Sequence, residues 1–538
     1  MKIKDIICKR RGARASGLVF SGIIMALALV FPRIGFLSWI AMVPAAVILI
    51  TMARDGDVSL RRMYGYGFLY FFSFYATGFH WFIALYPLSF IEGMGKLEAL
   101  FVVFLATFGL GALQAAFSAL FGVLLAFVAR RGIVSRHRCL LPVAAALMYG
   151  LFEWAQTFTW AGVPWSRLAI GQVESAVVLK SVSLFGPYFL GALIVCVNFF
   201  IAEFLLADEK KQKSVSLITA TLIVAVNASI GAILVSVDRD SGRAVTVAAV
   251  QPNVSSRDPW GFNTTTETMQ TLERLSLEAS ERGATLIVWP ETVFPMDFDE
   301  GSPVYDFTVE IARRCGATIV VGAFSEGEEL ERNSLFFVSP DGEVSETVYS
   351  KRHLVPFGEF VPMRGFFEAV FPSLVALLML DDDLEESKNS DIADTDAGKL
   401  GAIICFDSIY ETLTVDSVRD GAELLVLATN DSWFLESAAV TMHSYQARLR
   451  AAETGRYMVR SATTGISMVI SPDGKVLDDV PELSSGYALA TVDLRSGRTL
   501  YTVIGNTFSY ISLAAVLAAT VSAVIEWWRE IQKNKNKI

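Results

Sequence analysis

Three residues of the chain could together perform acyl transfer: Glu291, Lys351 and Cys405. A thiol attacks a carbonyl group as its thiolate, which a neighbouring ammonium group favours and for which a carboxylate can accept the proton. Each residue alone has a more ordinary explanation. A cysteine that ends an apolar strand, for example, is more often buried and unreactive. Together, each near the end of an apolar strand, they predict a nucleophile, a base and a cation in one site.

The segment from Arg243 to Arg498 carries these residues and alternates predicted strands with predicted helices. Short apolar, β-branched runs indicate strands at Val245–Val250, Thr285–Trp289, Thr318–Phe324, Ser334–Val338, Leu400–Cys405, Leu424–Ala428, Met458–Ala462 and Ser467–Ile470. Polar and apolar residues at helical period indicate helices at Thr265–Arg282, Pro303–Cys315, Ile409–Arg419 and Ser437–Thr454. This pattern predicts an α/β domain whose mixed sheet is covered by helices.

The composition indicates that this domain is only one of two unlike parts. Of the 538 residues 53% are hydrophobic and 19% are charged, which is too apolar for an ordinary soluble protein and too charged for one wholly within a membrane. The net charge of −10 argues against a nucleic-acid partner. The 5 cysteines are scattered, without a CxxC pair or metal-ligand spacing, so we expect no disulfide framework, no metal and no cofactor.

Long apolar runs outside the domain predict about eight membrane spans. They lie at Leu18–Phe31, Phe36–Met52, Met63–Tyr86, Glu98–Ala129, Leu141–Trp160, Val177–Leu206, Val215–Val237 and Thr507–Trp527. The first run could be a signal peptide, but the second follows it so closely that an uncleaved helical hairpin is favoured. We therefore expect a membrane bundle at 1–242, a catalytic domain at 243–498, and a last helix with a basic tail at 499–538.

Basic residues alternate with poorly charged connections along these spans, which predicts the orientation of the chain in a bacterial inner membrane. The leader, the connections 54–62, 130–138 and 210–213, and the tail 529–537 are rich in Lys and Arg, so both termini are predicted to be cytoplasmic. The catalytic domain then lies on the periplasmic side. A transporter or a plain anchor is the alternative for the bundle, but the buried-type residues His80 and Glu153 suit interior hydrogen bonding better than an ion path.

The region around residues 366–396 leaves two interpretations open. Phe366–Leu380 is strongly apolar but too short to span a membrane, so it is either a lipid-facing arm or lid, or a buried helix of the domain. The acidic stretch Asp381–Asp396 indicates a solvated loop insertion. We also predict that Cys315 is buried at the end of its helix and unpaired.

Five sequence stretches make the chain similar to the bacterial apolipoprotein N-acyltransferases, a family within the nitrilase (carbon–nitrogen hydrolase) superfamily. They are Val288–Thr292 (VWPET), Ser350–Pro362 (SKRHLVPFGEFVP), Ile404–Asp407 (ICFD), Thr429–Phe434 (TNDSWF) and Arg450–Arg456 (RAAETGR). The similarity extends to the bundle through the number of spans and the position of the domain before the last helix. It implies a multi-pass helical bundle with a nitrilase-like αββα sandwich.

The resemblance also implies roles for individual residues. Glu291 would be the general base, Lys351 the cation that supports the thiolate and the tetrahedral intermediate, and Cys405 the nucleophile that becomes a thioester. Glu359 matches the supporting carboxylate of the family. The backbone N–H of Phe406 would form the oxyanion site with Lys351, where one donor contributes on the order of 3 kcal/mol.

Other positions are less certain matches to the family. Trp260 occupies the place of a tryptophan near the substrate, although a packing residue on a loop would look the same. Phe406 and Asp407 stand where the family often has Tyr and Glu, so a phenol is lost and a carboxylate is shortened. Met442 replaces an amide before His443, which puts a hydrogen bond in doubt there.

The function implied by the resemblance is the transfer of an acyl chain from a phospholipid to the α-amine of a diacylglyceryl-modified cysteine at the N-terminus of a lipoprotein. Membrane lipid is then a partner, and we expect a monomer. Two other classes stay open: a membrane-tethered amidase that uses the same three residues with water as acceptor, and a non-enzymatic envelope protein in which Cys405 is an unreactive thiol.

Overall fold

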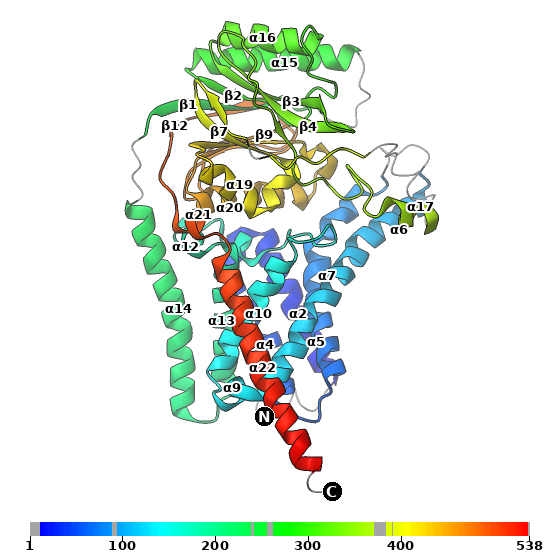
Figure 1. Cartoon of the computed structure of the whole chain (residues 1–538), viewed down its shortest axis with the longest axis vertical. Helices are drawn as coiled ribbons and strands as arrows, with labels where there is room; N and C mark the ends of the chain where they lie inside the picture. Colours follow the sequence, from blue (N-terminus) through cyan, green and yellow to red (C-terminus); the bar gives the residue numbers. More distant parts are fainter. Residues whose placement is uncertain are drawn as a thin grey trace. The chain divides into compact units, whose positions relative to one another are not determined.

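The computed structural model describes residues 11–88, 94–237, 242–254, 262–370, 383–389 and 391–535. The described residues form two compact units (Figure 1). The first unit contains the chain up to Ile83, Phe101–Val235 and the part from Ile504 onward, and the second contains Ala84–Leu100 and Ser236–Val503.

The first unit is a bundle of apolar helices. Its main helices are α2 (Arg11–Val30), α4 (Val43–Arg54), α5 (Leu60–Gly78), α7 (Leu110–Ser118), α8 (Leu120–Arg130), α10 (Leu140–Ala155), α13 (Pro187–Leu206), α14 (Lys210–Val237) and α22 (Thr507–Lys535). Six helical stretches of the described chain are long and apolar enough to cross a membrane: Arg11–Val30, Pro32–Arg54, Lys96–Arg130, Pro187–Leu206, Lys210–Val237 and Thr507–Lys535. The predicted multi-pass bundle is confirmed, and the two remaining predicted spans correspond to α5 and α10.

Two predicted spans differ from the helices that the structure contains. The predicted span Val177–Leu206 becomes helical without interruption only from Pro187, because Gly186 has a φ of 82° and Pro187 begins α13. The predicted span Met63–Tyr86 ends as an α-helix at Gly78 and continues as the 3₁₀ turn η2 (His80–Leu85). The apolar pattern therefore located these helices but not their ends.

Small residues bring the helices of the bundle close together. A Cβ atom added at Gly122 of α8 would lie 2.5 Å from the carbonyl oxygen of Met63 in α5, and one added at Gly22 of α2 would lie 2.5 Å from that of Tyr70. Close approach of this kind is a main source of helix association in membranes. Glu153 is buried and its Oε1 accepts a hydrogen bond of 2.9 Å from the Leu168 N–H, as expected for an interior hydrogen-bonded residue.

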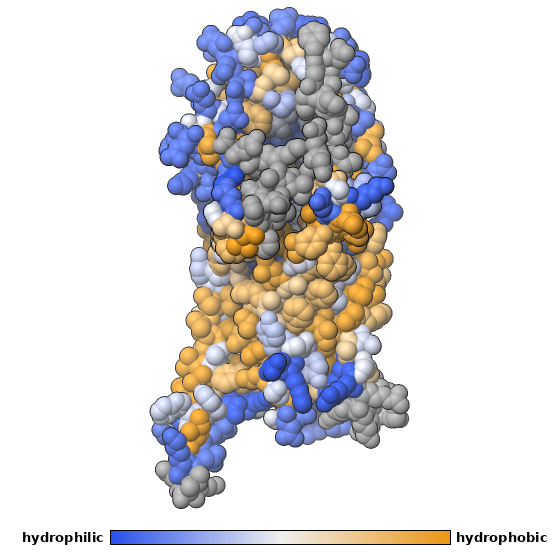
Figure 2. Space-filling view, turned by 90° about the vertical axis from the view of Figure 1, so that its right-hand side faces the viewer, coloured by the Kyte–Doolittle hydropathy of each residue, from blue (hydrophilic) through white to orange (hydrophobic). Residues whose placement is uncertain are grey.

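The outer surface of the bundle is apolar. Exposed large hydrophobic residues include Phe104, Leu222, Ile233, Leu517 and Val521. Figure 2 shows hydrophobic side chains over most of this face of the bundle, with hydrophilic ones gathered at one end of it. Apolar side chains that face outward over several helical turns suit a lipid environment rather than water.

The second unit contains two six-stranded mixed sheets. The first sheet has the order β12-β1-β2-β3-β4-β5, with β1 (Ala244–Gln251), β2 (Leu286–Val288), β3 (Thr318–Glu326), β4 (Glu331–Val338), β5 (Tyr349–Ser350) and β12 (Gly486–Asp493). The second has the order β11-β10-β9-β8-β7-β6, with β6 (Ala393–Thr395), β7 (Gly398–Ile404), β8 (Leu424–Thr429), β9 (Met458–Ala462), β10 (Ser467–Ile470) and β11 (Val476–Val480). The pairs β1–β2, β2–β3, β7–β8 and β8–β9 are parallel.

Four helices cover the outer faces of the two sheets. Helices α15 (Phe262–Glu281) and α16 (Pro303–Cys315) pack on the first sheet, while α19 (Glu411–Arg419) and α20 (Ala438–Thr454) pack on the second (Figure 1). The inner faces of the sheets contact each other through β1, β9 and β10. Strand β8 is buried along its whole length, as a central parallel strand should be. The predicted αββα sandwich is therefore confirmed.

Three strands escaped the sequence prediction: β6, β11 and β12, whereas the strand expected just before Lys351 is β5. The residues of β6 were predicted to belong to a solvated acidic loop, and that prediction is wrong, because Ala393 and Thr395 pair with β7. The described residues before them are also held in place. Glu385 forms an ion pair with Arg332 and accepts a 3.1 Å hydrogen bond from the Leu330 N–H.

Candidate active site

Three strand ends bring the predicted residues together. Glu291 follows β2 after Trp289 and Pro290, Lys351 directly follows β5, and Cys405 directly follows β7. Strands β2 and β5 belong to the first sheet and β7 belongs to the second. Since β4 and β5 contact β7, the three side chains meet where the two sheets face each other.

The Lys351 ammonium group lies between two carboxylates. Its Nζ is 2.9 Å from Glu291 Oε1 and 2.7 Å from Glu359 Oε1. The Lys351 residue is only 1% exposed and Glu291 only 4%. Burial alone would lower the pKa of Lys351, but the carboxylates of Glu291 and Glu359 raise it well above its ordinary value. Lys351 is therefore a fixed positive charge at neutral pH.

Two asparagines that the sequence interpretation did not single out orient the Glu291 carboxylate. Asn333 Nδ2 donates to Glu291 Oε1 over 2.8 Å, and the backbone N–H of Asn430 donates to Oε2 over 2.7 Å. Glu359 is held separately, since its Oε2 accepts a 2.8 Å hydrogen bond from the Val355 N–H. Asn430 directly follows β8, as Cys405 follows β7, and this shared position after a buried strand was a signal in the sequence.

Cys405 sits at a strained turn. Its φ is 47°, in the left-handed region that non-glycine residues rarely adopt, and it begins the 3₁₀ helix η5 (Cys405–Ile409). Burial and the Glu291 carboxylate raise the pKa of the Cys405 thiol, while the Lys351 ammonium group lowers it. The resting thiol is thus protonated beside a group that can accept the proton. Phe406 is the second residue of η5, where backbone N–H groups have no partner within the helix.

Asp407 holds the turn that carries Cys405. Its carboxylate is fully buried and accepts hydrogen bonds from the N–H of Ile404 at 3.1 Å, the N–H of His353 at 2.8 Å and the hydroxyl of Tyr349 at 2.9 Å. Burial raises the pKa of Asp407 to about 6, against the lowering effect of Lys351 and of these donors. The carboxylate therefore links β5 and β7, the two strands that end at Lys351 and Cys405.

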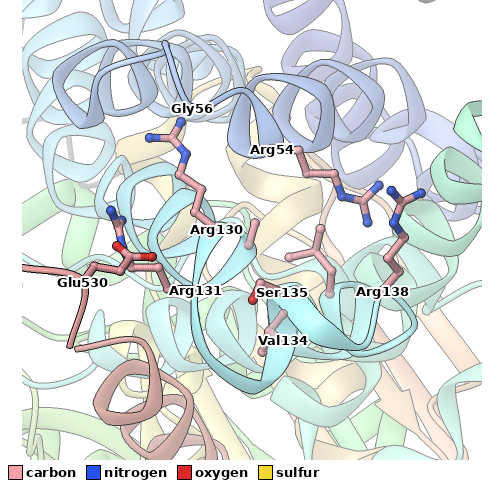
Figure 3. Close-up of a pocket in the computed structure, with 10 residues that line it drawn as sticks. Arg54, Gly56, Arg130, Arg131, Val134, Ser135, Arg138 and Glu530 are labelled. Atoms are coloured by element: carbon pink, nitrogen blue, oxygen red, sulfur yellow. The ribbon is translucent and has the colours of Figure 1, made fainter. Parts of the chain in front are cut away.

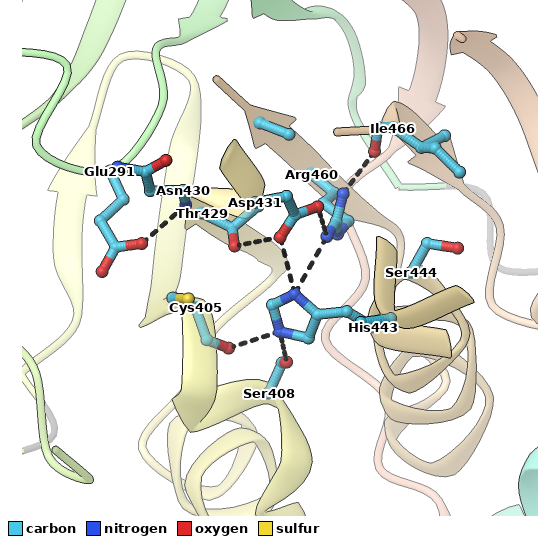
Figure 4. Close-up of polar contacts among 12 residues, drawn as sticks. Glu291, Cys405, Ser408, Thr429, Asn430, Asp431, His443, Ser444, Arg460 and Ile466 are labelled. Atoms are coloured by element: carbon cyan, nitrogen blue, oxygen red, sulfur yellow. Dashed lines mark hydrogen bonds and ion pairs between the residues drawn. The ribbon is translucent and has the colours of Figure 1, made fainter. Parts of the chain in front are cut away.

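A buried network of three side chains supports the Cys405 backbone from the other side (Figure 4). His443 Nε2 lies 3.1 Å from the Cys405 carbonyl oxygen, and His443 Nδ1 lies 2.8 Å from Asp431 Oδ1. Arg460 Nη2 donates to Asp431 Oδ2 over 2.7 Å. Burial alone would raise the pKa of Asp431, but Arg460 and His443 hold it well below its usual range. His443 thus contacts the site although Met442 replaces the amide.

Comparison with known proteins identifies the family. A family model described as "Carbon-nitrogen hydrolase" matches residues 246–501, and one described as "Apolipoprotein N-acyltransferase N-terminal domain" matches residues 21–200. The apolipoprotein N-acyltransferase of Geobacter metallireducens is 29% identical over 524 residues, which cover 95% of this chain and 95% of that protein. The chain belongs to the apolipoprotein N-acyltransferase family. The name of the Geobacter metallireducens relative describes an enzyme that N-acylates apolipoproteins.

Other relatives in this family have similar coverage. The apolipoprotein N-acyltransferase of Gloeobacter violaceus is 28% identical over 519 residues, covering 96% of this chain and 95% of that protein. Among solved structures, Nit3 of Saccharomyces cerevisiae, a nitrilase superfamily member, covers 47% of this chain and 90% of its own, with 20% identity and a TM-score of 0.36. An amidase from Nesterenkonia sp. has 18% identity, covers 48% of this chain and 93% of its own, and has a TM-score of 0.36.

Several expectations from the sequence concern residues outside the group of Glu291, Lys351 and Cys405. Trp260 and most of the apolar segment Phe366–Leu380 lie outside the described residues. The described beginning of that segment belongs to α17 (Arg364–Val370), in which Phe366 and Val370 are exposed, so this part is not a buried helix. Cys315 ends α16 as a free, half-buried thiol. Within the described ranges, no group of three or more His, Cys, Asp or Glu side chains is arranged to hold a metal ion.

Proposed function

We propose that this enzyme N-acylates lipoproteins through a thioester on Cys405. The carrying observation is the buried Lys351 ammonium group, which lies 2.9 Å from Glu291 Oε1 and acts on the Cys405 thiol, in a chain of the apolipoprotein N-acyltransferase family. The acyl donor is a phospholipid, and the acceptor is the α-amine of a diacylglyceryl-modified N-terminal cysteine. No metal or organic cofactor is required by this chemistry.

In the first step, the Cys405 sulfur attacks the ester carbonyl of the phospholipid while Glu291 accepts the thiol proton. The tetrahedral oxyanion is stabilised by Lys351 and the Phe406 N–H, where one such donor contributes about 3 kcal/mol. The intermediate collapses by breaking the ester C–O bond. Glu291 returns the proton to the leaving lysophospholipid oxygen, and Cys405 carries the acyl group as a thioester.

In the second step, the lipoprotein amine attacks the thioester carbonyl. Glu291 accepts a proton from the amine nitrogen, the C–S bond breaks and the N-acyl amide leaves. The departing thiolate forms beside the Lys351 ammonium group and regains the proton from Glu291. Glu359 acts as a positioning residue, because it shares the Lys351 ammonium group with Glu291 at 2.7 Å. Asp407 supports the turn between these groups.

The orientation of the chain is part of the proposal. We assign residues 1–242 to the membrane bundle, 243–498 to a catalytic domain on the periplasmic side, and 499–538 to a last helix that ends in the cytoplasm, with a monomer as the working unit. Both substrates are lipids, so a domain at the outer surface of the inner membrane can receive them by lateral diffusion without moving them fully into water. Trp260 remains a proposed substrate contact.

The tethered amidase is not favoured, because an amidase has no use for the acyltransferase-type N-terminal domain that matches residues 21–200. A non-enzymatic role is disfavoured by the intact set of Glu291, Lys351 and Cys405. The two enzyme classes differ in their acceptor. An amidase would hydrolyse small amides in the absence of phospholipid, whereas the proposed enzyme needs a phospholipid to become acylated.

Intact-mass spectrometry of the purified protein incubated with phosphatidylethanolamine in detergent tests the proposal. We expect the wild type to gain one fatty-acyl mass that neutral hydroxylamine removes. Cys405→Ala and Glu291→Gln should gain none, whereas Cys315→Ala, which removes the other described thiol of the same unit, should still be acylated. A folded wild type whose Cys405 can be alkylated but never carries an acyl group would exclude the phospholipid donor.

A further inference from the structure

Four arginines line a cavity in the helical bundle, in a part of the sequence far from the proposed catalytic residues. The cavity has a volume of about 550 Å³, and its charged lining residues are Arg54, Arg130, Arg131, Arg138 and Glu530 (Figure 3). Its volume lies in the range of ordinary ligand sites, about 300–1,000 Å³. Two carboxylates pair with these four guanidinium groups, Glu530 with Arg131 and Glu203 with Arg54, so the cavity keeps a net positive charge that favours an anionic ligand.

Two of the arginines are held in place by the ends of neighbouring helices. Arg54 ends α4 and binds both carboxylate oxygens of buried Glu203, with Nη1 3.1 Å from Oε2. Arg130 ends α8, and its Nε donates to the Ala53 carbonyl oxygen over 2.7 Å. A guanidinium group has five N–H donors, so these contacts fix both groups and still leave donors for a ligand. Binding an anion therefore requires little ordering of the site.

The remaining arginines add charge to the same space. Arg54 and Arg138 both line the cavity (Figure 3), and like charges around one cavity repel unless an anion lies between them. Arg131 Nε is 3.0 Å from Glu530 Oε2, so the single carboxylate of the lining is already engaged. Phosphate oxygens match guanidinium groups in geometry, since each arginine can donate two parallel hydrogen bonds.

The position of the arginines along the helices identifies the source of the phosphate. Arg54 is the last residue of the membrane span Pro32–Arg54, and Arg130 is the last residue of Lys96–Arg130. Residues at the ends of spans lie at the depth of lipid headgroups. We infer that this cavity binds the phosphate group of an anionic phospholipid, as basic pockets between membrane helices do. It is a second lipid site, separate from that of the acyl donor.

Thermal unfolding of the full-length protein in neutral detergent tests the inference, with phosphatidylglycerol, phosphatidylcholine and inorganic phosphate added separately. We expect phosphatidylglycerol to raise the Tm and phosphatidylcholine to raise it far less. The Arg131→Gln/Arg138→Gln variant should need about 30-fold more phosphatidylglycerol for the same shift, because two cations near a membrane surface are removed. Arg138→Gln alone, which changes an exposed side chain, serves if the double variant does not fold.

Arg136→Gln is the matched control. Arg136 lies between the two substituted arginines, at the end of helix α9 (Gly132–Arg136), pairs with Glu526 at 3.0 Å and is not among the residues that line the cavity. It should respond to phosphatidylglycerol as the wild type does. An equal response of the wild type and the double variant would overturn the inference, and so would an equal loss in the control. A shift of the same size with inorganic phosphate would show that the site binds soluble phosphate and not a lipid.

Discussion

The single ammonium group of Lys351 faces two carboxylates, those of buried Glu291 and partly buried Glu359, and this imbalance links stability to the proposed chemistry. Glu291 and Glu359 both lie within 3 Å of Nζ, and the N–H groups of Asn430 and Val355 donate to their remaining oxygens. Without the cation, two negative charges would face each other out of water. Removing one partner of a buried ion pair costs about 3–5 kcal/mol, because the other charge is left uncompensated.

We therefore expect Lys351→Met to abolish the acyl adduct and also to reduce the free energy of unfolding by about 3–5 kcal/mol. Cys405→Ala should abolish the adduct without a comparable loss of stability. Cys405 is half-buried, and its replacement leaves no buried charge without a partner. Unfolding in detergent and intact-mass spectrometry on the same samples measure both effects. Equal stability of the two variants would mean that Lys351 is not the cation that balances this site.

His353 gives the domain a dependence on acidic pH. Burial lowers the pKa of His353 to about 4, helped by the nearby Arg352 charge, while its ring stacks on Tyr410 with 3.9 Å between centroids. The unfolded chain binds a proton at its ordinary pKa of about 6.5. Between these values the unfolded state binds more protons than the folded state, so the His353 contribution to stability is complete above pH 6.5 and is lost as the pH falls toward 4.

His353→Phe should keep the stacking and remove this loss. Allowing for the partial exposure of the ring, the variant should lose roughly 1–2 kcal/mol less stability than the wild type between pH 7 and pH 4.5. Asp407, whose pKa burial raises to about 6, acts in the opposite direction over this range. Because Asp407 is present in both proteins, the difference between their stability-versus-pH curves reports His353 together with its contact to Asp407, whose Oδ1 lies 3.9 Å from His353 Nδ1. Parallel curves would contradict the assignment.

At the scale of elements, the ends of buried strands determine which side chains meet. The strands before Glu291 and Cys405 are continuous apolar runs, so the sequence predicted them and the residues that follow them. It did not predict the edge strands β11 and β12, because charged or polar residues interrupt their apolar pattern and both are partly exposed. An edge strand needs only one buried side, which leaves a weak signal in the sequence.

The contacts inside the site were harder to predict than its members. Residues Glu291, Lys351 and Cys405 carry recognisable chemistry, but Asn333 and Asn430 act through geometry that only the paired sheets create. Asn333 lies within β4, where an amide has no special meaning in the sequence, and Asn430 contributes a backbone N–H that every residue type except proline possesses. The positive φ of Cys405 also depends on the turn that Asp407 holds.

Helix packing in the bundle makes a prediction of its own at Gly122. A Cβ atom there would lie 2.5 Å from the Met63 carbonyl oxygen, so no side chain fits without moving α5 away from α8. We expect Gly122→Val to destabilise the bundle by about 1–3 kcal/mol and lower the Tm in detergent. Gly65→Val, at a position in α5 where an added Cβ meets nothing within 4 Å, controls for the loss of glycine in a membrane helix. Equal effects of both substitutions would contradict the close contact.

For the whole molecule, the distribution of charge along the chain sets the expected orientation in the membrane. Two apolar helices flank the second unit in the sequence: α14, which begins with the basic segment Lys210–Lys213, and α22, which ends at Lys535 in a basic segment. A segment between two such helices is carried across the membrane if the basic ends remain in the cytoplasm. The loop that carries Cys139 is also basic and should lie on the cytoplasmic side, as the basic ends of α14 and α22 do.

Cysteine accessibility in intact spheroplasts tests this orientation, because a maleimide that cannot cross membranes labels only the outer side. One protein keeps Cys139, which is exposed, and replaces Cys8, Cys196, Cys315 and Cys405. The second also replaces Cys139 and carries Glu328→Cys in an exposed loop of the catalytic domain. We expect the second protein to be labelled in intact spheroplasts and the first only after permeabilisation. The reverse pattern would place the proposed active site in the cytoplasm. The lipidated amine of an exported lipoprotein could not reach Cys405 there. Both the proposed substrate and the proposed orientation would then be wrong.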